Sequence, residues 1–492
     1  MLISGLALGA VLGFVMQRGR FCVTGFLRDI FTQRSWRGFV ALLIVISVHA
    51  IGLAALTSAG VITPEYNELA PLAVIVGGVI FGLGIVLAGG CASGTWYRSG
   101  EGLIGSWIAL VFYALSAAAM KTGFLNGLQD SLKERTVGLT SIHASLGISI
   151  WPLVIALSAV TAYFAVRFLR EEFSGPRPAT LAPRKSGLAH ILTEKAWHVY
   201  ATAAIVGVLG VIAWPLSAAT GRNDGLGITT PSSNLANYVV TGDTERFDWG
   251  VLLVLGILVG SFIAAKASGE FRLRVPDATQ GARSVVGGIF MGVGAAWAGG
   301  CTVGNGMVQT SLFSYQGWLA LASIAAGVAI AAKLWLKPSA PSLNDVPSTP
   351  STTNDTAVSA TVPVTSAATS PVSLPGSEGA ADTEASPLAG AFAVAPVALL
   401  DRSVVKQEDG KLKPLGGGRY ELDTVGAVCP FPLIEAKDAI NKIEVGEELV
   451  IPFDCTQATD AIPRWAAKDG HEVTNFEQTG EAGWTISVRR GK

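Results

Sequence analysis

Five cysteines are the residues of this sequence best suited to chemistry, and three of them stand where an apolar run breaks into small residues. Cys91 lies in the stretch Gly-Gly-Cys-Ala-Ser-Gly, and Cys301 lies in the similar stretch Gly-Gly-Cys-Thr-Val-Gly-Asn-Gly. Cys22 ends a third break, Gln-Arg-Gly-Arg-Phe-Cys. Glycine leaves backbone amides and carbonyls free to meet a ligand. The recurrence predicts two related halves, each with a thiol at a break in a helix.

Other roles for these residues stay open at this level. A free cysteine is often a small buried hydrophobe, so ordinary packing is the alternative for Cys22, Cys91 and Cys301. Asn305, four residues after Cys301, is either a donor to a ligand or a helix cap. Five scattered cysteines are too few for a disulfide framework, so free thiols are predicted throughout.

The fourth cysteine stands before two prolines, in Cys429-Pro430-Phe431-Pro432. Proline suits the first turn of a helix, which would place Cys429 at the positive helix N-terminus and favour a thiolate or a persulfide. A buried cysteine at a turn is the alternative. A Cys-x-x-Cys motif is absent from the sequence, which disfavours dithiol–disulfide exchange. Cys455 is either a sulfur acceptor or a packing residue.

The elements that position these residues are mostly apolar helices. The chain has 492 residues, of which 50% are hydrophobic and only 14% charged, against about 25% in soluble proteins. The net charge of −1 argues against a nucleic-acid partner. Nine runs are predicted to cross or enter a bilayer. They lie at about 1–17, 37–59, 71–89, 103–120, 148–168, 197–218, 250–266, 285–299 and 316–336.

These runs predict a membrane domain at 1–337 with two related halves, about 1–168 and 196–337. The segment 13–22 resembles 260–272, as the Cys91 stretch resembles the Cys301 stretch. The short runs 1–17 and 285–299 fit half-helices that end inside the membrane, a plan that recurs in transporters. Basic residues gather in the connections 18–37, 167–195 and 266–283, which predicts an N-terminus outside and a C-terminus in the cytoplasm.

The remaining sequence divides into a tether and a small domain. Residues 338–417 are rich in Pro, Ser, Thr and Ala, which predicts a disordered tether. Residues 418–492 are predicted to form a two-layer α/β sandwich. Its expected strands lie at 420–423, 448–453, 472–477 and 484–489, and its expected helices lie from 433 to 443 and at about 458–468.

Two family resemblances cover nearly all of this sequence except the tether. The C-terminal residues Cys429-Pro430-Phe431-Pro432-Leu433, with Leu422-Asp423 before them and Gly470-His471-Glu472-Val473 after them, resemble the TusA-like sulfur-carrier family. The resemblance implies that Cys429 carries sulfur as a persulfide. Where many members have Asp-Pro, this sequence has Asp454-Cys455.

The membrane part resembles the YeeE/YedE family of sulfur transporters, through the three motifs that contain Cys22, Cys91 and Cys301. The resemblance implies thiosulfate uptake along a path lined by these cysteines. We expect Gly90, Gly300 and Asn305 to belong to the same path. Arg20 and Arg98 are predicted at the cytoplasmic interface, where they snorkel or pair with acids, and an anion-attracting vestibule is the alternative.

A thiol-lined path suits this substrate physically. Stripping water from a dianion in hydrocarbon is prohibitive without compensating donors. Thiols are weak donors, and weak sites in series let an ion enter and still leave.

The resulting hypothesis is a multi-pass protein of the bacterial inner membrane. It takes up thiosulfate and delivers it to its own cytoplasmic carrier domain, and other cytoplasmic sulfur acceptors are expected beyond that domain. Transport is the expected main activity, and a sulfurtransferase or thiosulfate-splitting activity of Cys429 stays open. The sequence indicates no cofactor and no metal site. The alternatives are a transporter of another sulfur or selenium species, and a membrane-anchored sulfurtransferase that transports nothing. No proton-relay carboxylate is apparent inside the predicted spans, so the driving force stays open.

Overall fold

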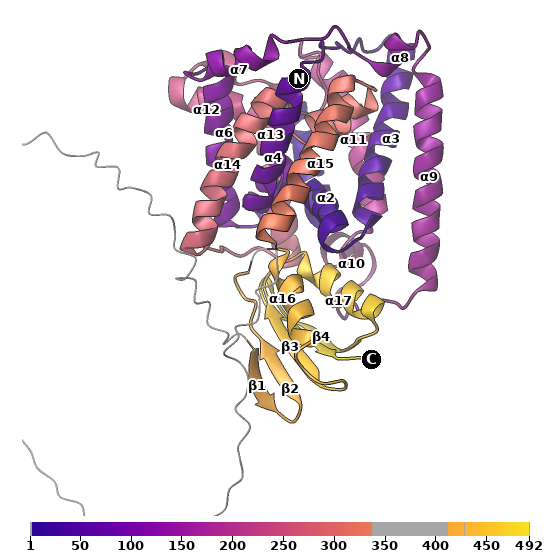
Figure 1. The fold of residues 1–492 in the computed structure, drawn as a ribbon, viewed down its shortest axis with the longest axis vertical. Coiled ribbons are helices and arrows are strands. Elements are labelled where there is room, and N and C mark those ends of the chain that lie inside the picture. Colours follow the sequence, from indigo (N-terminus) through magenta and orange to yellow (C-terminus); the bar gives the residue numbers. More distant parts are fainter. Residues whose placement is uncertain (1, 337–411, 428, 492) are drawn as a thin grey trace, which may run out of the picture. The chain divides into compact units, whose positions relative to one another are not determined.

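Long apolar helices form the first two thirds of the chain, and a mixed β-sheet with two helices forms its end (Figure 1). The computed structural model describes residues 2–336, 412–427 and 429–491, and the described residues on both sides of the gap pack into a single unit. We call residues 2–336 the membrane part and residues 412–491 the C-terminal part.

The α-helices of the membrane part, followed by its two short irregular helices, have the following bounds. They are α1 (Ile3–Arg18), α2 (Val23–Thr32), α3 (Arg37–Ser58), α4 (Pro71–Leu87), α5 (Ala92–Gly100), α6 (Ile104–Lys121), α7 (Asn126–Lys133), α8 (Ile142–Ser145), α9 (Trp151–Ser174), α10 (Gly187–Thr193), α11 (Val199–Ala218), α12 (Thr229–Thr241), α13 (Trp249–Ser268), α14 (Ala278–Ala298), α15 (Tyr315–Trp335), the 3₁₀-helix η1 (Thr244–Arg246) and the π-helix η2 (Gly304–Gln309).

Among the described residues, eight helical stretches are long and apolar enough to span a membrane, one fewer than predicted. Two of them contain a break, because Ile3–Thr32 joins α1 to α2 and Pro71–Gly100 joins α4 to α5. The stretch predicted at 285–299 lies in α14, which is long enough but is not among the eight. Its first turns carry the polar side chains of Gln280 and Arg283.

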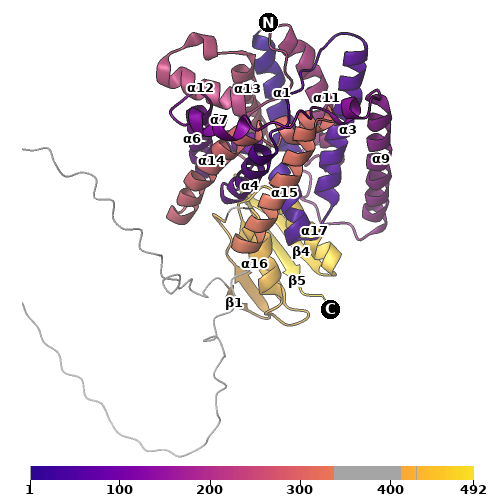
Figure 2. The ribbon, with the colours of Figure 1, turned by 45° about the horizontal axis from the view of Figure 1, so that its top comes forward.

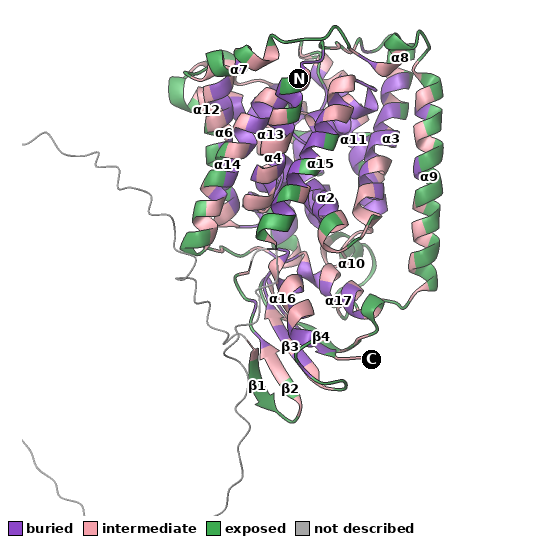
Figure 3. Ribbon diagram, in the orientation of Figure 1, coloured by how far each residue is buried: buried purple, intermediate pink, exposed green. Residues whose placement is uncertain are grey.

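Burial differs sharply among these helices. The helix α9 stands at the edge of the bundle in both views and leaves most of its length exposed (Figures 1, 2 and 3). Only 11% of the most apolar segment of α9 is buried, whereas 67% of the corresponding segment is buried in the stretch that contains α1. An exposed apolar helix of this kind fits contact with lipid.

The helices that the sequence repeat relates to one another pack in pairs. The helix α1 runs along α13, and α4 runs along α14. Glycines line both contacts. A Cβ atom at Gly9 would lie 3.0 Å from the Cα atom of Gly256, and one at Gly256 would lie 2.9 Å from the Cα atom of Gly9. Small residues let helix backbones approach this closely in a membrane, where apolar lipid gives helices no hydrophobic reason to associate.

The C-terminal part is a five-stranded sheet packed against α16 (Phe431–Ile440) and α17 (Ala458–Asp469). The strand order is β1-β2-β3-β5-β4, with β2 and β3 parallel and the other pairs antiparallel. The strands are β1 (Leu412–Gly416), β2 (Arg419–Leu422), β3 (Glu448–Phe453), β4 (Glu472–Gly480) and β5 (Gly483–Arg489).

Alternate residues of β3, Leu449, Ile451 and Phe453, point into the core, as period-two burial in a half-buried strand requires. The predicted α/β sandwich is therefore confirmed.

The sheet begins before its predicted boundary. Composition predicts residues 412–417 as part of the tether, but Leu412–Gly416 pairs with β2 in the sheet. The rest of the predicted tether, through residue 411, lies outside the described residues.

We predict that Gly9→Ala destabilises the membrane part, because the added methyl group meets the backbone of α13. Overpacking of a tight contact costs about 1–3 kcal/mol. The thermal unfolding midpoint of the purified protein in detergent should fall by several degrees.

Gly281→Ala is the matched control, because Gly281 also lies in a helix, α14, but has open space around its Cα atom. Its midpoint should stay unchanged or rise, since alanine favours helix over glycine. Equal midpoints for the two variants would contradict the role of the glycine contact.

Candidate functional site

The three membrane cysteines share one local geometry. Cys22 precedes α2 and Cys91 precedes α5, both with extended backbone at the N-cap position. The carbonyl oxygen of each cysteine accepts a hydrogen bond from the amide four residues on, at 3.0 Å for Cys22 and 2.8 Å for Cys91. Cys301 does the same toward the Asn305 amide, at 2.9 Å. Each thiol therefore stands where one helix has ended and the next backbone turn begins.

Two of these thiols meet across the break of α4 and α5. A Cβ atom at Gly94 would lie 3.4 Å from Cys91 Sγ and 3.9 Å from Cys22 Sγ. The two thiols are also within hydrogen-bonding reach of one another. Cys91 Sγ has the Ser93 hydroxyl at 3.4 Å. The tertiary structure thus brings Cys22 and Cys91, which are 69 positions apart in the sequence, into one sulfur-lined spot.

Asn305 caps the break at Cys301. Its Nδ2 group donates to the carbonyl oxygens of Ala298 at 2.8 Å and Gly300 at 3.0 Å, and its Oδ1 atom accepts from Gln316 Nε2 at 3.0 Å. Of the two roles left open by the sequence, the structure therefore places this side chain in the cap.

The two glycines that precede the cysteines differ. A Cβ atom at Gly300 would lie 3.3 Å from atoms of Asn305, whereas one at Gly90 would meet its nearest neighbour, Arg98 Nη1, at an ordinary 3.6 Å. Asn305 thus leaves little room for a side chain at Gly300, and packing does not explain Gly90.

Tyr113 on α6 interacts with the third thiol and with one of the other two. Its ring is fully buried, its hydroxyl donates to Thr229 Oγ1 at 2.8 Å, and it lies within electrostatic range of both Cys91 and Cys301. Sequence reasoning missed it because a tyrosine within an apolar helix carries no local signal of function.

Arginines lie next to the Cys22 thiol and close to one another. Arg98 is only 6% exposed, and its guanidinium donates to the Gly89 carbonyl and lies 3.8 Å from Cys22 Sγ. Arg20 pairs with Glu270 at 3.3 Å, and Arg18 pairs with the same carboxylate at 3.2 Å. Burial raises the pKa of Glu270, but Arg20 and Arg18 outweigh it and hold that pKa below its usual range.

The expectation that Arg20 and Arg98 snorkel at the membrane surface is therefore wrong for Arg98. Its side chain is buried because the turn between α4 and α5 folds over it, and its donors are used by a carbonyl and a thiol. Arg20 has the predicted acidic partner in Glu270, and its guanidinium also donates to the Thr459 hydroxyl of the C-terminal part.

A cleft of about 810 Å³, which includes space open to solvent, lies next to these arginines. We call it the junction cleft. From the membrane part it is lined by Arg20, Arg98, Glu101 and Arg274, and from the C-terminal part by Asp454 and the two cysteines Cys429 and Cys455. Arg274 faces Asp454 at 3.9 Å. Glu101 is 5% exposed.

Cys429 and Cys455 form a disulfide, with their Cα atoms 6.3 Å apart. The prediction of free thiols therefore holds for Cys22, Cys91 and Cys301 but is wrong for this pair. The pairing has no sequence signal, because 26 positions separate the two residues and the fold alone brings the start of α16 next to the end of β3. Cys429 does precede the N-terminus of a helix, as predicted.

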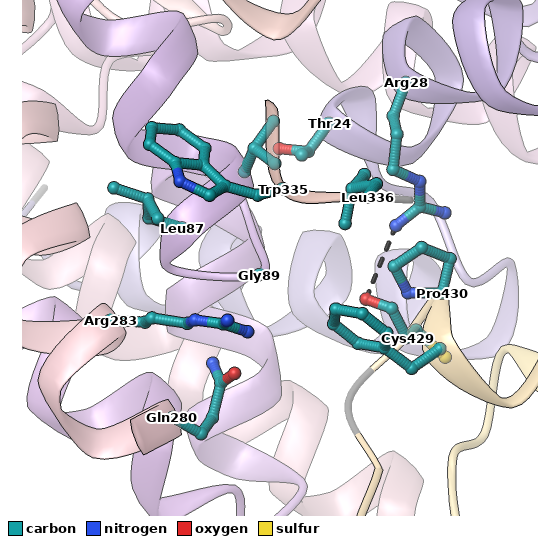
Figure 4. A pocket seen from close by; sticks show the side chains of 12 residues that line it. Thr24, Arg28, Leu87, Gly89, Gln280, Arg283, Trp335, Leu336, Cys429 and Pro430 are labelled. Atoms are coloured by element: carbon teal, nitrogen blue, oxygen red, sulfur yellow. Dashed lines mark hydrogen bonds between the residues drawn. The ribbon is translucent and has the colours of Figure 1, made fainter. Parts of the chain in front are cut away.

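A second, smaller cleft of about 450 Å³ is also lined by Cys429 (Figure 4). Arg28 donates from Nη1 to the Cys429 carbonyl oxygen at 3.4 Å, shown by the dashed line. Arg283 and Trp335 line the same cleft. Cys429 thus lines two clefts that both contain buried or half-buried arginines.

Metal chemistry finds no support in the described residues. Within 2–336, 412–427 and 429–491, no group of three His, Cys, Asp or Glu side chains is arranged to hold a metal ion. The chemistry available at this site is that of thiols, guanidinium groups and carboxylates.

Comparison with known proteins fits this division of the chain. Residues 18–330 match the family model described as sulphur transport, and residues 420–490 match the model described as sulfurtransferase TusA. The chain is 51% identical over 328 residues to a thiosulfate transporter, TsuA, of Escherichia coli, covering 67% of this chain and 93% of that protein. It is 32% identical over 337 residues to the TsuA thiosulfate transporter of Spirochaeta thermophila, covering 65% of this chain and 94% of that protein.

The C-terminal part has its own relative. It is 59% identical over 70 residues to a putative sulfur carrier protein, TsuB, of Escherichia coli, covering 14% of this chain and 93% of that protein. The two parts thus match two separate proteins of one bacterium, each over nearly its whole length. The chain belongs to the sulphur-transport family and is a multi-pass membrane protein that carries a TusA domain at its C-terminal end.

Proposed function

We propose that this chain takes up thiosulfate across the bacterial inner membrane and hands it to its own TusA domain. The observation that carries the proposal is the position of Arg98, which contacts the Cys22 thiol and also lines the junction cleft with Cys429 and Cys455. One arginine thus links the sulfur-lined spot of the membrane part to the cysteine pair of the TusA domain. Two relatives named as thiosulfate transporters support the choice of substrate.

The proposed path runs from Cys301 past Tyr113 to Cys91, Cys22 and Arg98. Each member of this series interacts with the next, by electrostatics at Tyr113 and by direct contact from Cys91 onward. A dianion needs donors in place of its water, and thiols together with a tyrosine hydroxyl supply weak ones. Arg98 supplies the strong donor at the end of the series. An ion can therefore advance without being trapped on the way.

We place the junction cleft and the TusA domain in the cytoplasm. The connections rich in arginine and lysine, 18–37, 167–195 and 266–283, support this orientation by the positive-inside rule. Fusion of carrier to transporter makes the hand-off intramolecular, which raises the effective concentration of the acceptor.

In the cleft, the reduced cysteine pair would act on thiosulfate in two steps. The Cys429 thiolate attacks the outer sulfur of thiosulfate, the sulfur–sulfur bond breaks, and sulfite leaves with its electron pair, so that Cys429 carries a persulfide. The Cys455 thiolate then attacks the Cys429 sulfur, and the terminal sulfur leaves and takes a proton as hydrosulfide. The product is the Cys429–Cys455 disulfide, which a cytoplasmic dithiol must reduce before the next cycle.

We expect Cys91→Ala to lower the initial rate of uptake of radiolabelled thiosulfate into membrane vesicles by about tenfold or more, equivalent to the loss of roughly 1.4 kcal/mol of stabilisation. In cells, deletion of residues 420–492 should slow growth on thiosulfate less than Cys91→Ala does, because diffusible carriers can replace the domain.

Ser99→Ala is the matched control in the same helix, since its buried hydroxyl only bonds to the Thr95 carbonyl, at 2.7 Å. Uptake that survives Cys91→Ala would contradict the role of this thiol in the path, and parent protein that takes up no thiosulfate would favour a membrane-anchored sulfurtransferase without transport. Competition by unlabelled selenium or other sulfur anions in the same vesicles tests the alternative substrates.

A second prediction concerns the cysteine pair. In reduced Cys455→Ser protein mixed with thiosulfate, Cys429 should accumulate a persulfide, because no thiol remains to release the outer sulfur. Mass spectrometry of the alkylated peptide should show the mass of one added sulfur atom.

Cys429→Ser is the control, and its Cys455 should gain no sulfur. Hydrosulfide release by Cys455→Ser at the rate of the reduced parent, with no persulfide intermediate, would rule out the second step.

A further inference from the structure

Glu101 is a buried carboxylate at the end of the proposed path, and the hand-off described above gives it no role. It follows α5 directly, where its amide closes the last turn of that helix onto the Tyr97 and Arg98 carbonyls. Its own carbonyl accepts from the Arg272 amide at 3.2 Å, and the following Gly102 carbonyl accepts from the Arg274 amide at 3.0 Å. The backbone thus fixes Glu101 in the wall of the junction cleft.

Charged groups from several elements surround Glu101. Arginines Arg18 and Arg20 come from the end of α1 and the turn after it, Arg98 from α5, and Arg274 from the segment after α13. The acidic groups are Glu270, Asp454 and the Tyr97 phenol.

Most of these charges are already paired. Arg18 and Arg20 share Glu270, and Arg274 faces Asp454. By contrast, no ion pair within 4.0 Å joins Glu101 to any cation in the part of the chain that the structure describes. A buried carboxylate without a close cation is stabilised by binding a proton.

The net charge of the cleft also favours a protonated Glu101 when a dianion is bound. Its lining carries three arginines, Arg20, Arg98 and Arg274, and two carboxylates, Glu101 and Asp454, so its net charge is one positive when all are ionised. Neutralising Glu101 gives a net charge of two positive, which matches a divalent anion. It also leaves Arg98, which contacts Cys22, without a competing carboxylate.

We propose that Glu101 is a proton-binding residue of the transport cycle, which takes up a proton when a thiosulfate dianion occupies the junction cleft and releases it when the cleft empties. This inference rests on the proposed function, because it assigns the proton to the same anion and the same cleft. The sequence carries no sign of a carboxylate whose protonation depends on the substrate, and Glu101 is such a carboxylate in this proposal.

The electrostatic surroundings support a proton site that works near neutral pH. Burial raises the pKa of Glu101, and the neighbouring Glu270 raises it further, to about 7, against the lowering effect of Arg98 and Arg274. A bound dianion is a further negative charge in the cleft, so it raises this pKa again and draws in the proton. By linkage, protons must then strengthen thiosulfate binding to the same extent.

The experiment measures thiosulfate binding to the full-length protein in detergent by calorimetry, without reductant. Under that condition the Cys429–Cys455 disulfide prevents consumption of the ligand. The apparent Kd should weaken about tenfold between about pH 6 and about pH 8, as one linked proton leaves a group with a pKa of about 7. In Glu101→Gln the Kd should be nearly independent of pH and close to the value of the parent protein at low pH.

Glu171→Gln is the control, since Glu171 is an exposed carboxylate on α9, paired with Arg167 at 3.1 Å, outside the cleft. It should keep the pH dependence of the parent. A second readout needs no variant: adding thiosulfate to weakly buffered parent protein at about pH 7 should make the solution more alkaline, as protein takes up protons.

The outcomes separate the two proposals. Thiosulfate binding without proton uptake, or a pH dependence that Glu101→Gln retains, would overturn the role of Glu101 and leave the proposed function standing. Loss of binding in Glu101→Gln at every pH would also overturn it, because the charged carboxylate would then be required. If the parent protein binds no thiosulfate at any pH and its vesicles take up none, the proposed function itself fails, and the proton role fails with it.

Discussion

The close contact between repeat-related helices is the constraint on which the rest of this structure depends. The helices α1 and α13 touch backbone to backbone, and α4 and α14 do the same. A Cβ atom at Gly77 would lie 2.7 Å from the carbonyl oxygen of Gly294 on the facing helix, and a Cβ atom at Gly294 would lie 2.7 Å from the carbonyl oxygen of Gly77. Only glycine permits this approach. Because each of these pairs contains a helix that ends at a break, the contact fixes where the broken ends lie. Cys22 and Cys91 meet at Gly94 as a result.

Each break in turn leaves backbone groups that need new hydrogen-bond partners. Where a helix stops inside a membrane protein, its carbonyls and amides lose their helical partners and must find others. Here Arg98 donates a hydrogen bond to the Gly89 carbonyl, and Asn305 donates to the carbonyls of Ala298 and Gly300. The same residues that satisfy the backbone therefore bring donors to the thiols. The repeat adds a further pair, because Arg20 and Glu270 occupy related positions in the two halves and form an ion pair with one another.

The junction cleft unites the two proposals made for this protein. It combines arginines that attract an anion, a cysteine pair that can remove sulfur from it, and a carboxylate whose charge opposes it. A site made only of arginines would hold a dianion strongly and release it slowly. A carboxylate that exchanges a proton with the cleft makes the positive charge adjustable, so that binding and release can each be favourable in turn. The covalent fusion keeps the acceptor thiol in the same protein as this cleft.

The sequence by itself determined the class of fold and the residues with chemistry. Hydropathy predicted the membrane helices, although one stretch with polar first turns did not qualify as a span, and glycine-rich breaks predicted where the helices end. Period-two and helical patterns predicted four strands and both helices of the TusA domain within a few residues, because these patterns are local, but they missed β1. The cysteines with chemistry were also predictable, because the motifs around Cys22, Cys91, Cys301 and Cys429 are local in the sequence.

Only the tertiary structure decided which of these residues act on one another. The Cys429–Cys455 disulfide, the burial of Arg98, the interaction of Tyr113 with two thiols and the burial of the Glu101 carboxylate in the junction cleft all depend on segments far apart in the sequence. Partners of this kind leave no local pattern, because a buried charge or thiol is defined by what surrounds it, and those surroundings are supplied by packing between distant helices.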